Sequence, residues 1–162
     1  MTAPALRIGH GIDAHRFVPR RPLMLGGVRI PYDRGLMGHS DGDAVTHALA
    51  DALLGAAGLG DMGRHYPSTD PKWRDTAGVD FLADVARKLE EAGFTLVSAH
   101  VVAVAEEPRL SPHLQAMRNA ICAALGVEAG VVEVGVTTTD GMGFAGRGEG
   151  IAASATAIIA PR

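Results

Sequence analysis

The sequence predicts an α/β (α+β) sandwich in which helices cover one face of a small mixed β-sheet. The main observation is the order of its patterned segments, which gives a β-α-β-α-β-β core. The length agrees, because 162 residues of which 47% are hydrophobic can bury one core of their own. We therefore expect a single domain over residues 1–162.

The N-terminal half contains the patterns of a strand, a hairpin and a helix. Residues 6–18 alternate like a strand, and a second extended segment around the turn-like Gly26–Gly27 predicts a short N-terminal hairpin. Apolar residues then recur at helical spacing from the candidate N-cap Ser40 to Gly58. A polar connection at 61–75 without a pattern of regular structure follows, and loops of that length usually serve a function.

The C-terminal half alternates helices and strands. We expect helices at 78–93 and 111–126, and strands at 94–106, 131–140 and 150–160. Ser111 and Pro112 fit the cap and the first position of the second of these helices. Since no further helix remains to cover the other face of the sheet, we expect another copy of the chain to cover it.

Composition excludes several classes of function. The net charge of −3 and the pI near 6.1 leave no basic surface for nucleic acid. Cys122 is the single cysteine, which excludes an intramolecular disulfide and a cysteine-based zinc ribbon. Residues 1–11 lack the apolar stretch of a signal peptide, and no segment approaches the roughly 20 apolar residues of a membrane span. We expect a cytoplasmic protein with no membrane and no nucleic-acid partner.

Three side chains form a candidate metal site. Asp13 and His15 are two positions apart in a predicted strand, so they point to the same side. His47 lies one turn into the predicted helix, between Asp43 and Asp51 at four-residue spacing, and a nearby carboxylate suits a metal-bound histidine. Two histidines and one aspartate leave a fourth position open, as in catalytic zinc sites. The ordinary alternative is a turn-forming aspartate, a hydrogen-bonded strand histidine and a helix histidine in an ion pair.

The segment before the predicted helix suits an anion. Ser40 followed three residues later by Asp43 resembles a capping box, which is a structural role. The same helix start presents free backbone N–H groups beside His39, and such a place attracts an anionic oxygen. A phosphate next to the candidate metal ligands is therefore expected.

A glycine-rich segment at 137–150 also suits phosphate. It contains a literal G-x-G-x-x-G pattern, but a strand-like run follows instead of a helix, so it is not a dinucleotide-binding fingerprint. A hairpin loop would explain the glycines. Its threonine hydroxyls, Asp140 and Arg147 are nevertheless the groups that suit a diphosphate and its magnesium ion.

Six motifs, in order and at family spacing, make the chain resemble a known family over nearly its whole length: RIGHGIDAHRF, GGVRIP, HSDGDAVTHALADALLGAAGLGDMG, YPSTDP, EEPRLSPH and TTTDGMGFAGRGEGIA. The family is that of the 2-C-methyl-D-erythritol 2,4-cyclodiphosphate synthases of non-mevalonate isoprenoid biosynthesis. The resemblance implies a metal-dependent phosphorus–oxygen lyase that cyclises 4-(cytidine 5'-diphospho)-2-C-methyl-D-erythritol 2-phosphate and releases CMP. It also implies a homotrimer with active sites between adjacent subunits.

The resemblance further implies roles for individual residues. Asp13, His15 and His47 match the ligands of one zinc ion per subunit, and Asp140 matches the ligand of a Mg²⁺ or Mn²⁺ ion that binds with the substrate. His39 matches a catalytic residue that stabilises the transition state together with Thr138. The positions that match substrate contacts are Asp13, Ala14, His15, His39 and Ser40; Asp61, Met62 and Gly63 at the erythritol hydroxyls; Tyr66, Pro67, Ser68, Thr69 and Asp70 in the same loop; Ala105, Glu106, Glu107, Pro108, Arg109, Leu110 and Ser111 at the cytidine; Thr137, Thr138, Thr139 and Asp140; and Phe144 and Arg147 at bound phosphate in the trimer interior.

The chain departs from the family pattern at a few positions, and two other functions fit the same ligands. Asp140 stands where Glu is common, Arg109 where Lys is common, and Ser111 where the pocket is often more apolar. A zinc-dependent phosphoester hydrolase would use the same triad to activate water. A non-catalytic trimer would bind a metal or a diphosphate without turnover. The nucleotide-pocket segment at 105–111 favours the synthase.

Overall fold

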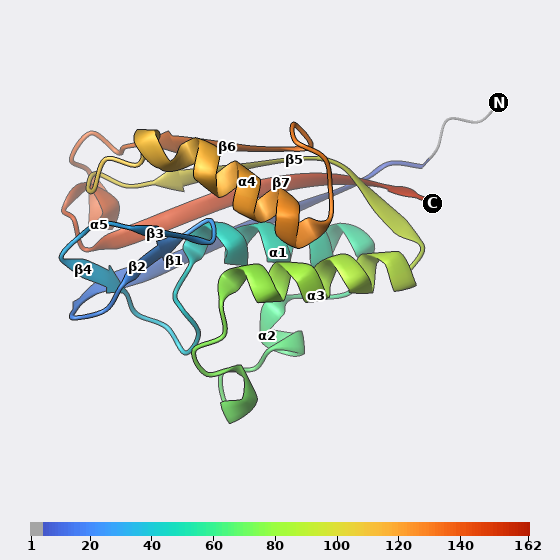
Figure 1. The fold of residues 1–162 in the computed structure, drawn as a ribbon, viewed down its shortest axis with the longest axis horizontal. Helices are drawn as coiled ribbons and strands as arrows, with labels where there is room; N and C mark the ends of the chain where they lie inside the picture. Colours follow the sequence, from blue (N-terminus) through green and yellow to red (C-terminus); the bar gives the residue numbers. More distant parts are fainter. Residues whose placement is uncertain (1–4) are drawn as a thin grey trace.

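The computed structural model describes residues 5–162 and contains a five-stranded sheet and a separate two-stranded hairpin (Figure 1). The strands are β1 (Arg7–Pro19), β2 (Leu23–Leu25), β3 (Val28–Ile30), β4 (Arg34–Leu36), β5 (Phe94–Val104), β6 (Val132–Thr137) and β7 (Gly150–Pro161). The helices are α1 (Ala44–Ala57), α2 (Met62–His65), α3 (Gly78–Glu91), α4 (Leu114–Leu125) and α5 (Gly143–Gly146), with 3₁₀ turns at Pro71–Trp73 and Ser111–His113. The predicted fold class is confirmed.

The sheet is mixed, with the strand order β4-β1-β7-β5-β6. β5 and β6 are parallel, and the other neighbours are antiparallel. Because β6 and β7 are not neighbours, the glycine-rich segment between them is not a hairpin loop, and it contains the short helix α5 instead. The predicted hairpin is β2–β3, which lies outside the main sheet and turns at Gly26 and Gly27, with φ of 57° and 76°.

Helices α1, α3 and α4 lie together on one side of the sheet (Figure 1), and two glycines of β1 let α1 approach closely. A Cβ atom at Gly9 would lie 1.9 Å from the carbonyl oxygen of Ala52. One at Gly11 would lie 2.1 Å from that of Ala48. The helix and the strand therefore touch backbone to backbone, which requires glycine at both positions. This contact brings the start of α1 beside the second half of β1.

The N-cap of α1 is Asp43, which corrects the prediction of Ser40. The Asp43 carboxylate accepts hydrogen bonds from two backbone N–H groups in the first turn of α1. It also accepts from both N–H groups of the β2–β3 turn. One fully buried carboxylate thus satisfies the helix end and fixes the hairpin against it, which a serine hydroxyl three residues earlier cannot do. The predicted helix end at Gly58 is confirmed, with a left-handed φ of 73°.

Two segments differ locally from the predictions. Ser111 does not cap a helix: its hydroxyl lies 3.1 Å from Arg109 Nε, a 3₁₀ turn forms there, and α4 begins after it. The connection at 61–75 does contain regular structure, namely α2 and a 3₁₀ turn. Both are short and are capped by the side chains of Asp61 and Asp70, so they leave no hydrophobic periodicity to detect.

The opposite face of the sheet is exposed. In β7, Ala153, Ala155 and Ala157 are buried, whereas the alternate residues between them are partly or fully exposed. On β1, Ile8 and Ile12 are 70% and 67% exposed. Apolar strand residues in such a position favour the expected cover by another protein surface. Within residues 5–162 no helix is long and apolar enough to cross a membrane; residues 1–4, part of the stretch expected to lack a signal peptide, lie outside the described residues.

Candidate metal centre

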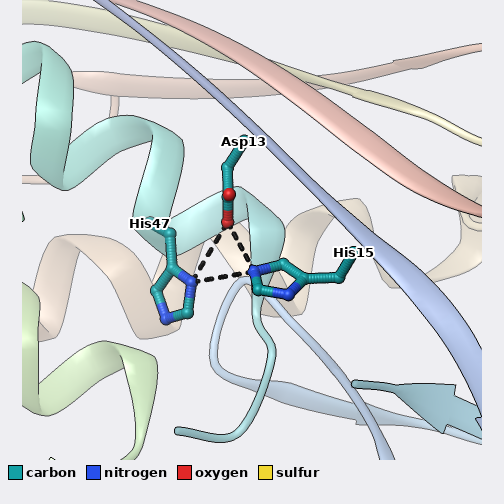
Figure 2. Close-up of side chains that lie close together, drawn as sticks. All are labelled: Asp13, His15 and His47. Carbon is teal, nitrogen blue, oxygen red and sulfur yellow. Dashed lines mark hydrogen bonds and ion pairs between the residues drawn. The ribbon is translucent and has the colours of Figure 1, made fainter. Parts of the chain in front are cut away.

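Asp13 and His15 from β1 and His47 from α1 point toward one another (Figure 2). Asp13 Oδ2 lies 2.7 Å from His15 Nε2 and 3.1 Å from His47 Nδ1. The two ring nitrogens are 3.3 Å apart. In a tetrahedral zinc site, bonds of about 2.0–2.1 Å place the ligand atoms roughly 3.3 Å from one another. The three groups therefore fit a single metal ion with little rearrangement.

The hydrogen bond made by Nδ1 of His15 indicates which ring nitrogen carries the proton and which is available to bind a metal ion. His15 Nδ1 lies 2.6 Å from the carbonyl oxygen of Met37, and because a carbonyl only accepts, Nδ1 carries the proton. In the neutral ring, Nε2 then offers its lone pair to the site. A backbone carbonyl on the remote nitrogen is a usual support for a metal-bound histidine, because it fixes the tautomer and the ring orientation.

The electrostatics of the site favour a positive charge beside Asp13. Burial by itself raises the pKa of Asp13, but hydrogen bonds and charge interactions with His15 and His47 outweigh it and hold the pKa well below its usual range. Burial by itself lowers the pKa of His15, and the Asp13 carboxylate outweighs this effect and raises the pKa. A proton or a metal ion supplies the positive charge that this arrangement stabilises.

His47 is positioned by the loop before α1. Its Nε2 lies 3.2 Å from the hydroxyl oxygen of Ser40 and 3.9 Å from Asp41 Oδ1. The predicted partners have other roles, since Asp43 is the N-cap and Asp51 Oδ1 accepts from the first N–H group of α2 at 2.8 Å. Among residues 5–162, neither of these two carboxylates is bonded to His47. Four-residue spacing suggested that Asp43 and Asp51 would contact His47, but both carboxylates accept hydrogen bonds from backbone N–H groups instead.

A cavity of about 380 Å³ opens beside the three side chains. Its lining comprises Asp13, His15, His39, Ser40, His47, Asp51, Met62, Gly63, Tyr66, Ser68, Trp73 and Phe81. The loop before α1 forms one wall and the connection at 61–75 forms another. His39 Nε2 lies 3.1 Å from the carbonyl oxygen of Asp70, and this hydrogen bond joins the two walls. The three candidate ligands thus share one cavity with His39 and Ser40 and with four of the predicted substrate contacts, Met62, Gly63, Tyr66 and Ser68. The other predicted contacts of this connection, Asp61, Pro67, Thr69 and Asp70, do not line the cavity.

The other predicted residues gather elsewhere. β5 and β6 run parallel, so their ends bring residues 105–111 beside Thr137–Asp140, where a backbone hydrogen bond of 3.0 Å joins the segments. Glu106 Oε1 accepts from the backbone N–H groups of Thr139 and Gly141, at 3.0 and 3.2 Å, and so fixes the turn that follows β6. Thr138 and Asp140 are exposed. Neither segment lines the metal cavity.

The remaining predicted positions, Ala14, Phe144 and Arg147, lie outside the lining of the metal cavity. Ala14 and Phe144 line a second cavity of about 620 Å³, which His15 also borders. Arg147 is on the surface, where its Nε lies 3.0 Å from Glu149 Oε1. His15 thus stands between the metal cavity and the cavity next to α5.

Several contributors to the site were not expected from the sequence. Asp41 approaches His47 and accepts from the N–H group at the start of α3, and the Arg21 guanidinium donates to the carbonyl oxygen of Ser40. Asp41 could have been suspected from its place in HSDGD. Trp73 and Phe81 form cavity wall from two separate segments, and local patterns carry no signal of such a meeting.

Comparison with known proteins agrees with this geometry. The sequence model of the YgbB family matches residues 6–160. The chain is 53% identical over 157 residues to the 2-C-methyl-D-erythritol 2,4-cyclodiphosphate synthase of Moorella thermoacetica, covering 97% of this chain and 96% of that protein. It is 55% identical over 155 residues to the synthase of the same name from Symbiobacterium thermophilum, covering 96% and 99%.

Solved structures agree as well. The bifunctional IspDF of Campylobacter jejuni matches with a TM-score of 0.95 and 39% identity over 99% of this chain, which spans 43% of that longer protein. A 2C-methyl-D-erythritol-2,4-cyclodiphosphate synthase in a CDP-bound form matches with a TM-score of 0.86 and 37% identity, covering 94% of this chain and 99% of that one. With agreement in sequence, in fold and in the length matched, the chain belongs to the YgbB family.

Proposed function

We propose that this chain cyclises 4-(cytidine 5'-diphospho)-2-C-methyl-D-erythritol 2-phosphate to 2-C-methyl-D-erythritol 2,4-cyclodiphosphate and releases CMP. The observation that carries the proposal is that the candidate metal ligands Asp13, His15 and His47 share one cavity with His39 and Ser40, in a chain whose relatives bear the name of this synthase. An oxygen of the 2-phosphate attacks the β-phosphorus of the same molecule, the bond from the β-phosphorus to the bridging oxygen breaks, and CMP leaves with that oxygen. Because both reacting groups belong to one molecule, the protein must mainly supply position and charge.

The proposed ions follow from the donor sets. Asp13, His15 and His47 would hold zinc, because two histidines and a carboxylate with an open fourth position are typical of catalytic zinc. Asp140 would hold Mg²⁺ or Mn²⁺, since hard carboxylate oxygens suit these ions. When bound, the two cations neutralise charge on the phosphates and align the attacking and leaving oxygens.

The remaining residues would bind and orient the substrate. His39 and Ser40 lie beside the metal cluster and would hold the 2-phosphate. The connection at 61–75 would contact the erythritol hydroxyls, and residues 105–111 would contact the cytidine. Thr138, together with His39, would stabilise charge as the phosphoryl group transfers.

We further propose a homotrimer of single-domain, cytoplasmic subunits. Two observations support shared active sites. Within the described residues 5–162, none of Thr137–Asp140 lines the metal cavity, and β1 exposes Ile8 and Ile12 on the uncovered face of the sheet. A second subunit that covers this face would also bring its own Thr138 and Asp140 to a neighbouring metal cavity. Sedimentation of the purified protein should give the mass of three chains.

³¹P NMR tests the reaction. The protein is incubated with the proposed substrate, zinc and magnesium. CMP together with a coupled pair of diphosphate resonances from one cyclic product is the expected result. Orthophosphate without the cyclic product would indicate a phosphoester hydrolase, and an unchanged spectrum would indicate a binding protein; either outcome would overturn the proposal.

A further inference from the structure

A side-chain hydrogen bond joins Tyr66, in the 61–75 connection, to the helical layer. The Tyr66 hydroxyl donates to Asp84 Oδ2 of α3 at 2.7 Å. The Tyr66 side chain borders the metal cavity, but its hydroxyl is directed to this carboxylate, and the residue as a whole is only 7% exposed. Asp84 itself lies outside the cavity lining. The Tyr66 hydroxyl therefore forms a hydrogen bond within the protein and does not point into the cavity.

The acceptor is held firmly in place. Lys88 Nζ lies 2.9 Å from Asp84 Oδ2, and Arg87 Nη2 lies 2.6 Å from Asp84 Oδ1. These partners are four and three residues along the same helix, so they keep the carboxylate ionised and oriented. Burial and the neighbouring carboxylate raise the pKa of Tyr66, so the hydroxyl remains a donor. Hydrogen bonds to charged groups are among the stronger ones in proteins.

The anchored ring organises the aromatic wall of the metal cavity. The Tyr66 ring centroid lies 4.6 Å from that of Phe81 and 5.0 Å from that of Trp73, the second contact being edge-to-face. Phe81 in turn lies 5.9 Å from the ring of His47. The Tyr66 ring thus packs the 61–75 connection against α3 and contributes to the aromatic wall beside His47.

We propose that Asp84 is a positioning residue for substrate binding, which acts by accepting the Tyr66 hydroxyl and so holding the 61–75 connection against the metal cavity. This inference rests on the proposed function, in which that connection contacts the erythritol end of the substrate. Asp84 touches no reacting atom. Loss of Asp84 should lower the fraction of molecules in which the 61–75 connection is placed to bind substrate, and it should therefore raise KM.

Tyr66→Phe tests the anchor with the least disturbance, because it removes only the hydroxyl and keeps the ring. KM for the cytidine-diphosphate substrate should rise about tenfold, the size of effect expected when a hydrogen bond to a charged group is lost, while kcat stays within about twofold. Asp84→Ala should do the same. The double variant should be no worse than either single one, because both remove one interaction.

Trp73 supplies a readout that does not depend on turnover, since it is the single tryptophan of the chain. In both variants its emission should shift to the red and its quenching by acrylamide should increase. Asp80→Asn is the matched control: it neutralises an exposed acid one turn earlier on α3 and should change neither KM nor emission.

Unchanged Trp73 emission in Tyr66→Phe and Asp84→Ala would overturn the proposal. A raised KM with unchanged emission would also overturn it, because the hydroxyl would then act on the substrate directly. If the unmodified protein releases no CMP, only the proposed function fails, and the emission of Trp73 still decides whether the anchor exists.

Discussion

The metal cavity and the Thr137–Asp140 region are built in opposite ways. At the cavity, both histidines of the cluster have a further hydrogen-bond partner within the same chain, the Met37 carbonyl for His15 and the Ser40 hydroxyl for His47. At Thr137–Asp140, Glu106 fixes the backbone of the turn, while Thr138 and Asp140 remain exposed. In the first region, all three candidate metal ligands come from one chain. The other presents reactive groups outward, which is what a site shared between subunits requires.

The largest effect on activity should follow from removing a candidate ligand of the metal cavity. His47→Ala, or His15→Ala, should remove the bound zinc and lower turnover by about a thousandfold or more, because the charge stabilisation supplied by such an ion is worth several kcal/mol. Metal analysis and turnover are measured on the same preparation. His113→Ala is the control, since it removes a histidine outside both regions. Zinc at full stoichiometry in both ligand variants would refute the ligand assignment.

Mixing two inactive variants tests whether each active site combines the two regions from different subunits. His47→Ala damages only the metal cavity, and Thr138→Ala damages only the outward-facing region. If each active site combines the two regions from adjacent subunits, refolding the variants together in equal amounts should restore about a quarter of wild-type activity, because one site in four then receives two intact halves. Each variant refolded alone is the control. No recovery in the mixture would mean that both regions act within one chain.

Removal of the outward-facing carboxylate should have a smaller effect. Asp140→Ala should leave zinc bound and lower the rate between about tenfold and a hundredfold, because the substrate phosphates lose one ligand of the second cation. The dependence of the rate on magnesium should disappear. Titration with magnesium at saturating zinc measures this, and a titration curve identical to that of wild type would show that Asp140 holds no ion.

The smallest predicted effect concerns the stability of the cavity wall at low pH. Burial by itself raises the pKa of Asp84, but hydrogen bonds from Tyr66, Lys88 and Arg87 outweigh it and hold the pKa below its usual 3.8. The folded state therefore binds fewer protons at Asp84 than the unfolded state near that pH. The resulting stability is fully present above about pH 5 and is lost as the pH falls through the folded-state pKa.

Asp84→Asn should accordingly lower the free energy of unfolding by less than about 1 kcal/mol at neutral pH, because the group is near the surface. The difference from wild type should shrink as the solution is acidified below about pH 4. Chemical unfolding followed by circular dichroism at several pH values measures it. A difference that grows on acidification would contradict the assigned direction of the pKa shift.

Local chemistry explains which predictions held. The longer strands and the long helices were predictable because their periodicity and their glycine ends are properties of neighbouring residues, as at Gly26–Gly27 and Gly58. The three-residue edge strand β4 was not predicted. The cap of α1 was not, because Ser40 and Asp43 both fit a helix start. What selects Asp43 is the β2–β3 turn, whose two N–H groups need the same carboxylate. Likewise Asp51 was at the right spacing from His47 but is occupied by α2.

The sequence by itself determined the order of the elements, the single cysteine and the chemical types in the candidate site, because these depend on composition, spacing and motif order. Only the tertiary structure decided that Asp13 and His15 meet His47, since a strand and a helix approach that closely only where Gly9 and Gly11 lack side chains. It also decided that Tyr66 faces Asp84 and that Thr138 faces outward. Contacts between distant segments depend on how whole surfaces pack, and no local pattern records that.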